Sequence, residues 1–136
     1  MLDDKCIFCK IIKGDIPSYT IYEDDEFKVI LDVGPVAKGH ALILPKNHYP
    51  SMYELPEEDA VKVVKLARKM MVKMTKALEC DGFNLVQNNG EAADQSVPHF
   101  HMHLIPRYQG GQKLYGYTPL EVPSEQMQEI LEKIKG

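Results

Sequence analysis

Runs of basic or apolar residues are missing from this 136-residue sequence. The formal net charge is −4 and lysines and arginines form no cluster, which argues against a general binder of nucleic acid or of anionic membranes. No apolar stretch approaches the length of a membrane-spanning helix. We therefore expect neither nucleic acid nor membrane as a partner. A small phosphorylated ligand stays compatible with the composition, because it needs only a local site.

Cysteine is also scarce, and the three cysteines, an odd number, do not form a disulfide framework. The opening residues MLDDKCIFCK contain acids and lack the apolar core of a signal peptide. These absences predict a cytoplasmic protein. Internal repeats, low-complexity segments and linkers are missing too, and a composition of 44% apolar and 26% charged residues fits one globular domain.

Three histidines alternate with apolar residues in the run of residues 99–105: His99, His101 and His103. This period of two is that of a β-strand, so the imidazoles share one face and the apolar side chains the other. The side chains expected in the core are Phe100, Met102 and Leu104.

Two kinds of chemistry compete for the histidine face, metal binding and nucleophilic or acid–base catalysis. In a strand, His99 and His103 lie roughly 13 Å apart at their Cα atoms, which makes one metal site built from all three histidines awkward. A division of labour, with one structural histidine and catalytic neighbours, fits better.

Cys6 and Cys9 form a C-x-x-C pair, which is typical of half a zinc site or of a redox pair. A redox pair favours a nearby βαβ unit, and the sequence shows none. A zinc site needs two more ligands, for which His40, His48 and His99 are available. From the cysteines alone, zinc binding and a pair of inert buried thiols both stay open.

The pattern of the remaining chain predicts an α+β fold, with an antiparallel sheet of about five strands, one long helix packed on it and short helices at both ends. A short amino-terminal helix is expected to end at Gly14. Strands are expected at residues 18–24, 26–32, 39–45 and 83–87, besides the histidine strand.

The long helix is predicted over residues 56–80, with Pro56 as its first helical residue and Asp81-Gly82 at its end. Cys80 is interpreted as a buried thiol. A carboxy-terminal tail holds a second amphipathic helix over residues 124–135, with Ser124 as its cap.

The apolar stripe of the long helix is wider than one sheet face needs. One ridge contains Ala60, Val64, Ala67, Met71 and Leu78, and the next contains Val63, Leu66, Met70, Met74 and Ala77. We expect the surplus to pack on a second subunit; a deeper monomeric core is the alternative.

Two polar features are ordinary when taken alone. Asp32, at a strand end before a turn, is typical of a turn-forming side chain. The loop of residues 88–98 carries small polar residues that could donate to an anion. Its place directly before the histidines strengthens this weak phosphate signal.

Together these motifs resemble those of the histidine triad (HIT) family, in its bacterial nucleotide-binding branch. Residues 99–105 fill every position of the motif His-φ-His-φ-His-φ-φ, where φ is apolar. Further matches occur in order at Cys6–Ile12, Tyr22–Asp25, Gly39-His40, Leu42–Lys46 and Gln95–Val97. The resemblance covers residues 6–107, as the core of a single HIT domain over residues 1–136.

The resemblance implies a nucleotide hydrolase or nucleotidyl transferase with His101 as nucleophile and a nucleotidyl-histidine intermediate. Purine nucleoside phosphoramidates or adenylated amines are the expected substrates, and dinucleoside polyphosphates are the alternative. A nucleotide-binding regulatory protein with little turnover and a purely metal-binding protein are rivals from other classes. Catalytic roles fall on His101, His103, Ser96 and His40.

The resemblance also assigns binding residues and a partner. Phosphate contacts fall on Asn88, Gln95, Ser96, Val97, His101 and His103, and nucleoside contacts on Asp32, Ile7, Phe8, Ile11, Val33 and Leu42. One structural zinc per chain is implied at Cys6, Cys9, His48 and His99, and a homodimer is expected. Asp94 departs from the family pattern, which has glycine there.

Overall fold

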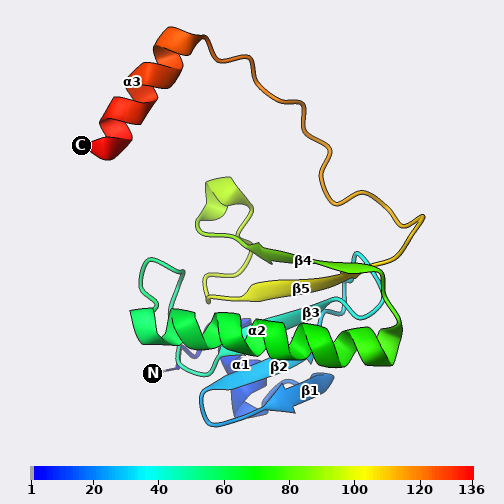
Figure 1. Ribbon diagram of the computed structural model, residues 1–136. Helices are drawn as coiled ribbons and strands as arrows, with labels where there is room; N and C mark the ends of the chain where they lie inside the picture. Colours follow the sequence, from blue (N-terminus) through cyan, green and yellow to red (C-terminus); the bar gives the residue numbers. More distant parts are fainter. Residues whose placement is uncertain (1) are drawn as a thin grey trace.

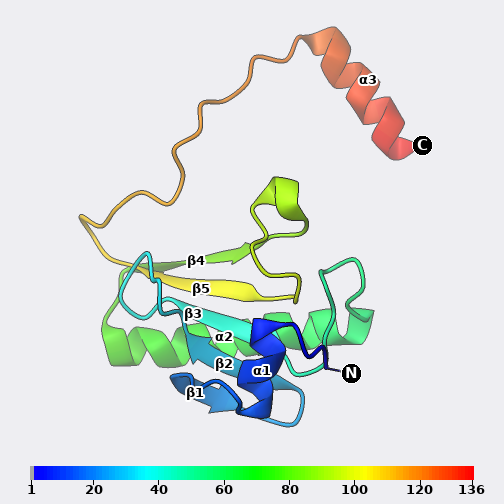
Figure 2. The same cartoon turned by 180° about the vertical axis from the view of Figure 1, so that it is seen from behind.

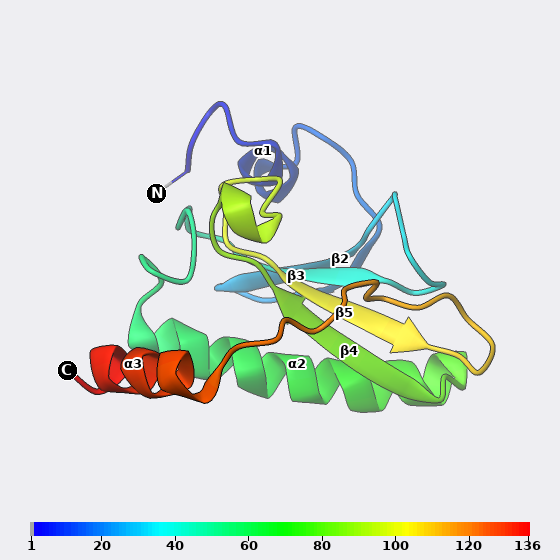
Figure 3. The same ribbon diagram turned by 90° about the horizontal axis from the view of Figure 1, so that it is seen from above.

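The computed structural model describes residues 2–136, in which a five-stranded antiparallel sheet separates two helices. The strand order is β1-β2-β3-β5-β4. Figure 3 shows α1 and α2 on opposite sides of this sheet. The expected α+β architecture is therefore confirmed. The elements, labelled in Figure 1, are α1 (Ile7–Lys13), β1 (Thr20–Glu23), β2 (Phe27–Leu31), β3 (Ala41–Pro45), α2 (Glu57–Leu78), β4 (Gly82–Gln87), the 3-10 turn η1 (Glu91–Ala93), β5 (Met102–Arg107) and α3 (Ser124–Lys135).

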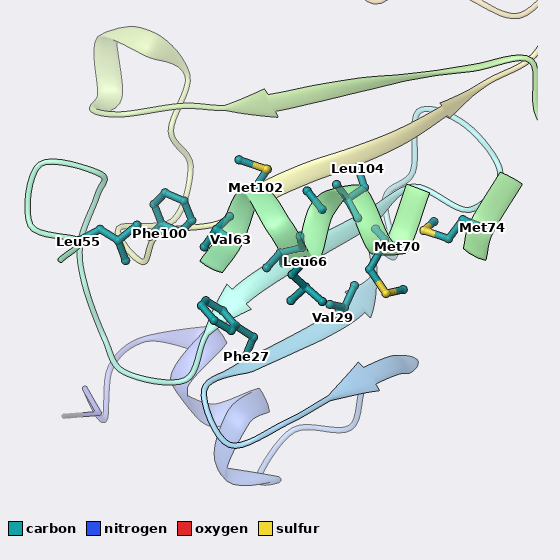
Figure 4. Close-up of a cluster of buried hydrophobic side chains, with 13 residues drawn as sticks. Phe27, Val29, Leu55, Val63, Leu66, Met70, Met74, Phe100, Met102 and Leu104 are labelled. Atoms are coloured by element: carbon teal, nitrogen blue, oxygen red, sulfur yellow. The ribbon is translucent and has the colours of Figure 1, made fainter. Parts of the chain in front are cut away.

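The main core lies between α2 and one face of the sheet (Figure 4). From the sheet side come Phe27, Val29, Ile43, Phe100, Met102 and Leu104, and from α2 come Val63, Leu66, Ala67, Met70 and Met74. Each large apolar side chain buried here contributes about 1.5–3 kcal/mol relative to exposure. One predicted helix ridge is thus largely buried, whereas Val64 of the other ridge is 62% exposed.

A smaller core on the opposite face joins α1 to the middle strands (Figure 2). Its buried members are Cys6, Phe8, Cys9, Ile11, Ile30, Leu42 and Leu44. Gly14 ends α1 in the left-handed conformation with φ 89°, as predicted. The histidine face of the sheet therefore lies beneath α1.

The predicted ends of the long helix are wrong by one or two residues. Pro56 has an extended ψ of 143° and only caps α2, while its carbonyl accepts from Ala60 N at 3.0 Å. At the other end the left-handed residue is Glu79, with φ 53°, because the chain must turn at once into β4. Cys80 is partly exposed and not buried, since it lies in this turn.

The histidine strand begins later than predicted, at Met102. The backbone of residues 99–101 lies outside the ladder, because Phe100 N donates to Tyr49 O at 2.6 Å and His99 N donates to Val97 O at 2.8 Å. The alternation of faces is nevertheless confirmed, since Phe100 and Leu104 are fully buried on the α2 side.

Residues 108–123 run away from the sheet, and α3 lies apart from it (Figures 1 and 2). Ser124 is the first residue of α3 and not its cap, because Met127 N donates to the carbonyl of Pro123. None of the residues described in α3 is buried. Among residues 2–136, no helix combines the length and apolarity needed to cross a bilayer.

Candidate active site and metal centre

His101 occupies the centre of the site and has one defined tautomer. Its Nδ1 lies 2.8 Å from the carbonyl oxygen of His99. A carbonyl can only accept, so Nδ1 carries the proton and Nε2 keeps its lone pair. The ring is 4% exposed, and the Phe8 ring meets it edge-on at 5.0 Å between centroids. The geometry thus holds one unprotonated ring nitrogen in a fixed direction.

His103 and His40 form a second, hydrogen-bonded pair beside His101. His40 Nε2 lies 2.9 Å from His103 Nδ1, and the carboxylate oxygen Oδ2 of Asp32 lies 3.6 Å from the same His40 atom. The pair forms because antiparallel β3 and β5 place Leu42 opposite His103 and so bring His40, just before β3, alongside. His40 and His103 are thus brought together as expected.

These imidazoles are neutral at pH 7. Burial lowers the pKa of His101 and of His40 below the ordinary 6.5. Burial, reinforced by the neighbouring His101 and His40, lowers the pKa of His103 to about 4. Neutral rings retain the lone pairs that nucleophilic attack and hydrogen-bond acceptance require.

Four potential metal ligands converge at the amino-terminal end of α1: Cys6, Cys9, His48 and His99. Cys9 Sγ lies 3.3 Å from His48 Nδ1 and 3.5 Å from His99 Nδ1, Cys6 Sγ lies 3.5 Å from His99 Nδ1, and the two Nδ1 atoms are 3.2 Å apart. Ligands at zinc distances in a tetrahedron are separated by about 3.3–3.8 Å. Both the donor set and its spacing therefore fit a closed tetrahedral zinc site.

Neighbouring groups orient two of these ligands. His99 Nε2 lies 2.9 Å from the carbonyl of Pro45, so its proton is on Nε2 and Nδ1 faces the sulfurs with a lone pair. Asp3 Oδ2 lies 3.9 Å from His48 Nε2. Burial lowers the pKa of His99 to about 4, which keeps its ring neutral.

The loop between β4 and β5 carries the expected phosphate-binding residues to the end of the sheet at which β5 begins. Gln95 braces this loop, since its Nε2 donates to Pro50 O at 2.7 Å and Val97 O at 3.0 Å and its Oε1 accepts from Gly90 N. Asn88 Nδ2 reaches the Asp94 carbonyl at 3.5 Å. Ser96 is exposed. The Gln95 amide is thus engaged within the protein.

Asp94 adopts the left-handed conformation, with φ 65°. Glycine takes this conformation without steric cost, and aspartate tolerates it better than most residues. Asp94 therefore has a backbone conformation that also suits the glycine expected here from the resemblance.

The expected nucleoside-binding residues do not surround one hollow. Asp32 and Val33 line an open cavity of about 380 Å³, together with His40. Ile7 lines another, of about 300 Å³, with Ser96 and Val97. The other three expected residues, Phe8, Ile11 and Leu42, are buried between α1 and the sheet. Asp32 also makes the turn expected from its sequence context, because its Oδ1 accepts from Gly34 N at 2.8 Å.

For the nucleophile the family resemblance implies a backbone carbonyl as the acceptor from its other ring nitrogen, but sequence reasoning did not identify which groups orient the histidine rings. The Pro45 and His99 carbonyls are main-chain atoms, so no residue type signals them. Tyr19, which lines the cavity at Asp32, comes from a segment with no motif.

Comparison with known proteins gives consistent matches. A model of the HIT domain matches residues 13–110. An uncharacterised HIT-like protein of Methanocaldococcus jannaschii is 43% identical over 131 residues, covering 96% of this chain and 99% of that protein. An adenosine 5'-monophosphoramidase of Saccharomyces cerevisiae is 38% identical over 140 residues, covering 99% and 86%.

Solved structures agree with this. A HIT family protein from Bacillus subtilis superimposes with a TM-score of 0.82 at 41% identity, covering 97% of this chain and 96% of that one. A zinc-bound histidine triad protein from Mycobacterium smegmatis gives a TM-score of 0.78 at 33% identity, covering 95% and 91%.

Proposed function

The chain belongs to the HIT family, and from this premise we propose that it is a nucleotide hydrolase that reacts at an α-phosphorus through His101. Purine nucleoside phosphoramidates and adenylated amines are the proposed substrates. The yeast relative's name, adenosine 5'-monophosphoramidase, supports this class. The observation that carries the proposal is the hydrogen bond from His101 Nδ1 to the His99 carbonyl, because it leaves Nε2 free to attack.

The reaction proceeds in two displacements. His101 Nε2 forms a bond to the α-phosphorus as the phosphorus–nitrogen bond to the amine breaks, and the amine leaves with a proton that the Ser96 hydroxyl relays from solvent. Water then attacks the phosphorus and loses one proton to solvent, the bond to Nε2 breaks, and a nucleoside monophosphate is released with neutral His101. Dividing the reaction into two steps lowers the barrier of each.

Positioned donors stabilise the charge that spreads over the phosphate oxygens in these steps. His103 supplies one of them. The loop residues Asn88, Gln95, Ser96 and Val97 supply the rest, once the substrate displaces the contacts that Gln95 makes with Pro50 and Val97. The Asp32 carboxylate accepts from the ribose hydroxyls, and Val33 contributes to the nucleoside cavity.

Cys6, Cys9, His48 and His99 hold one structural zinc per chain in this proposal. A closed Cys2His2 set leaves no position for a substrate. It ties the segment before α1 and the loop after β3 to the start of the catalytic run. The zinc-bound mycobacterial neighbour supports the choice of metal.

The proposal is tested by the variant His101→Ala. We expect it to lose turnover of adenosine 5'-monophosphoramidate by at least about 10³-fold while it retains AMP binding and the fold. Rapid quenching of the wild-type protein should show, by intact mass, one nucleotidyl group on His101. Full activity in the variant would rule out the mechanism.

A substrate panel then separates the alternatives. Faster turnover of dinucleoside polyphosphates than of phosphoramidates would identify the leaving group as a nucleotide instead of an amine. AMP binding without turnover of any panel member would identify a nucleotide-binding regulatory protein.

A further inference from the structure

The loop between β2 and β3 makes one hydrogen bond that the proposed reaction does not use. The backbone N–H of Val36 donates to Nδ1 of His40 at 3.2 Å. His40 is 4% exposed and Val36 is 37% exposed, so this contact is partly buried. A ring nitrogen that accepts from an amide carries no proton, and neutral His40 must therefore carry its proton on Nε2.

The tautomer of His40 determines the tautomer of His103. His40 Nε2 lies 2.9 Å from His103 Nδ1, so the Nε2 proton of His40 points at a nitrogen that has to accept it. His103 then carries its own proton on Nε2. The Asp32 carboxylate, 3.6 Å from His40 Nε2, favours the same tautomer of His40 because it attracts a proton at that atom.

The backbone of Val36 is held at both its N–H and its carbonyl. Its carbonyl accepts from Gln112 Nε2 at 2.9 Å, and the next carbonyl but one, that of Lys38, accepts from the Tyr108 hydroxyl at 2.8 Å. The start of the tail after β5 thus fixes the loop from outside, while His40 contacts it from within.

We propose that the Val36 amide is a positioning group that, through His40, makes His103 a hydrogen-bond donor at its substrate-facing nitrogen. This inference rests on the proposed function. With the opposite tautomer, His103 Nε2 would present a lone pair to the anionic phosphate and repel it. A lost donor to the developing charge typically lowers kcat by about 10²–10³-fold, and mixed tautomers would lower it less.

The test removes the Val36 N–H and observes the tautomers directly. Val36→Pro lacks the donor, and so does a protein carrying the α-hydroxy acid analogue of valine at position 36, in which an ester replaces the amide without changing the side chain. Val36→Ala is the matched variant that keeps the N–H. Ring 15N chemical shifts report which nitrogen of His40 and His103 is protonated, in substrate-free protein.

We expect wild type and Val36→Ala to show His40 and His103 protonated on Nε2 alone. In the ester protein both rings should populate the Nδ1-protonated form, and kcat should fall about 10-fold or more relative to Val36→Ala, with KM changed less than about threefold. If Val36→Pro fails to fold, the ester protein decides the question. An Nδ1 proton on wild-type His40, unchanged tautomers in the ester protein, or an unchanged kcat despite shifted tautomers would overturn the proposal. A protein without nucleotide turnover but with these tautomer shifts would instead overturn only the proposed function.

Discussion

Histidine 101 differs from an ordinary surface histidine because its surroundings decide both its charge and its proton position. Burial keeps the ring neutral, and the His99 carbonyl keeps the proton on Nδ1. The resemblance of the sequence motif to that of the HIT family assigns this residue the proposed role of nucleophile. It does not identify the carbonyl acceptor, because the backbone path of residues 99–101 depends on the hydrogen bond between Phe100 and Tyr49, far away in sequence.

The lowered pKa of His101 predicts an unusual pH profile. A depressed pKa means that the neutral, nucleophilic form persists as the pH falls below the ordinary value of 6.5. We therefore expect kcat/KM to have an acid limb whose midpoint lies below 6.5. Steady-state kinetics as a function of pH check it. A midpoint at or above 6.5 would contradict a buried neutral nucleophile.

The cluster of four potential metal ligands predicts where mutations change metal content. Cys6→Ser and His48→Asn should each reduce bound zinc well below one per chain, and they should lower thermal stability because metal binding is coupled to folding. His101→Asn and His103→Asn are the matched controls, and both should keep the full zinc content. Elemental analysis of untagged proteins makes the comparison. Loss of zinc in the controls would support the rival in which the histidine face itself binds the metal.

At the scale of helices and strands, sequence patterns can fail to predict where an element ends. The apolar periodicity of α2 predicts its buried ridge, because that ridge must match the sheet. It does not predict that Glu79 takes the left-handed position, since the end of the helix is determined by where β4 has to begin. Asp94 is a second non-glycine residue with positive φ, and it too lies where a short turn leads into the next segment.

Glu79 gives a stability prediction at the scale of a helix. A residue with a side chain is strained at φ 53°, and glycine is not. Glu79→Gly should therefore raise the free energy of unfolding by about 0.5–1 kcal/mol. Glu79→Ala retains a Cβ atom and should give no such gain. Denaturant unfolding with an unchanged m-value measures both. A gain for alanine as large as that for glycine would attribute the effect to lost charge instead.

For the molecule as a whole, the fold class follows from sequence, because alternation predicts the strands and a period of 3.6 predicts the long helix. The position of the carboxy-terminal arm does not follow. α3 exposes Met127, Ile130, Leu131 and Ile134, so its apolar face packs on no surface among residues 2–136 (Figure 1). The sheet edge at β4 is also available for contact, since β4 pairs only with β5 in the strand order.

The prediction of a homodimer is based on these exposed surfaces. Val61, Val64 and Val72 of α2 are each more than half exposed. Val64 lies on a ridge of the stripe for which the sequence left a partner subunit or a deeper core open, whereas Val61 and Val72 lie outside the two predicted ridges. Sedimentation should show a dimer at micromolar concentration. Val64→Glu should shift it towards monomer, because a charge at a desolvated contact costs about 2 kcal/mol or more.

Lys10→Glu, which changes the charge on α1 at the opposite face of the sheet, is the control and should leave the dimer intact. A monomer in the wild-type protein would remove the dimer and assign the exposed ridge to solvent.

His99 connects the four-ligand cluster with His101, a link that the sequence alone does not predict. Its ring belongs to the four-ligand cluster, whereas its carbonyl holds the proton of His101. If the cluster holds zinc as proposed, a chelator used during purification would shift the His99 carbonyl and so the ring of His101, which it does not bind. Preparations should then differ in specific activity in proportion to the zinc they retain, and adding zinc back should restore the deficient ones.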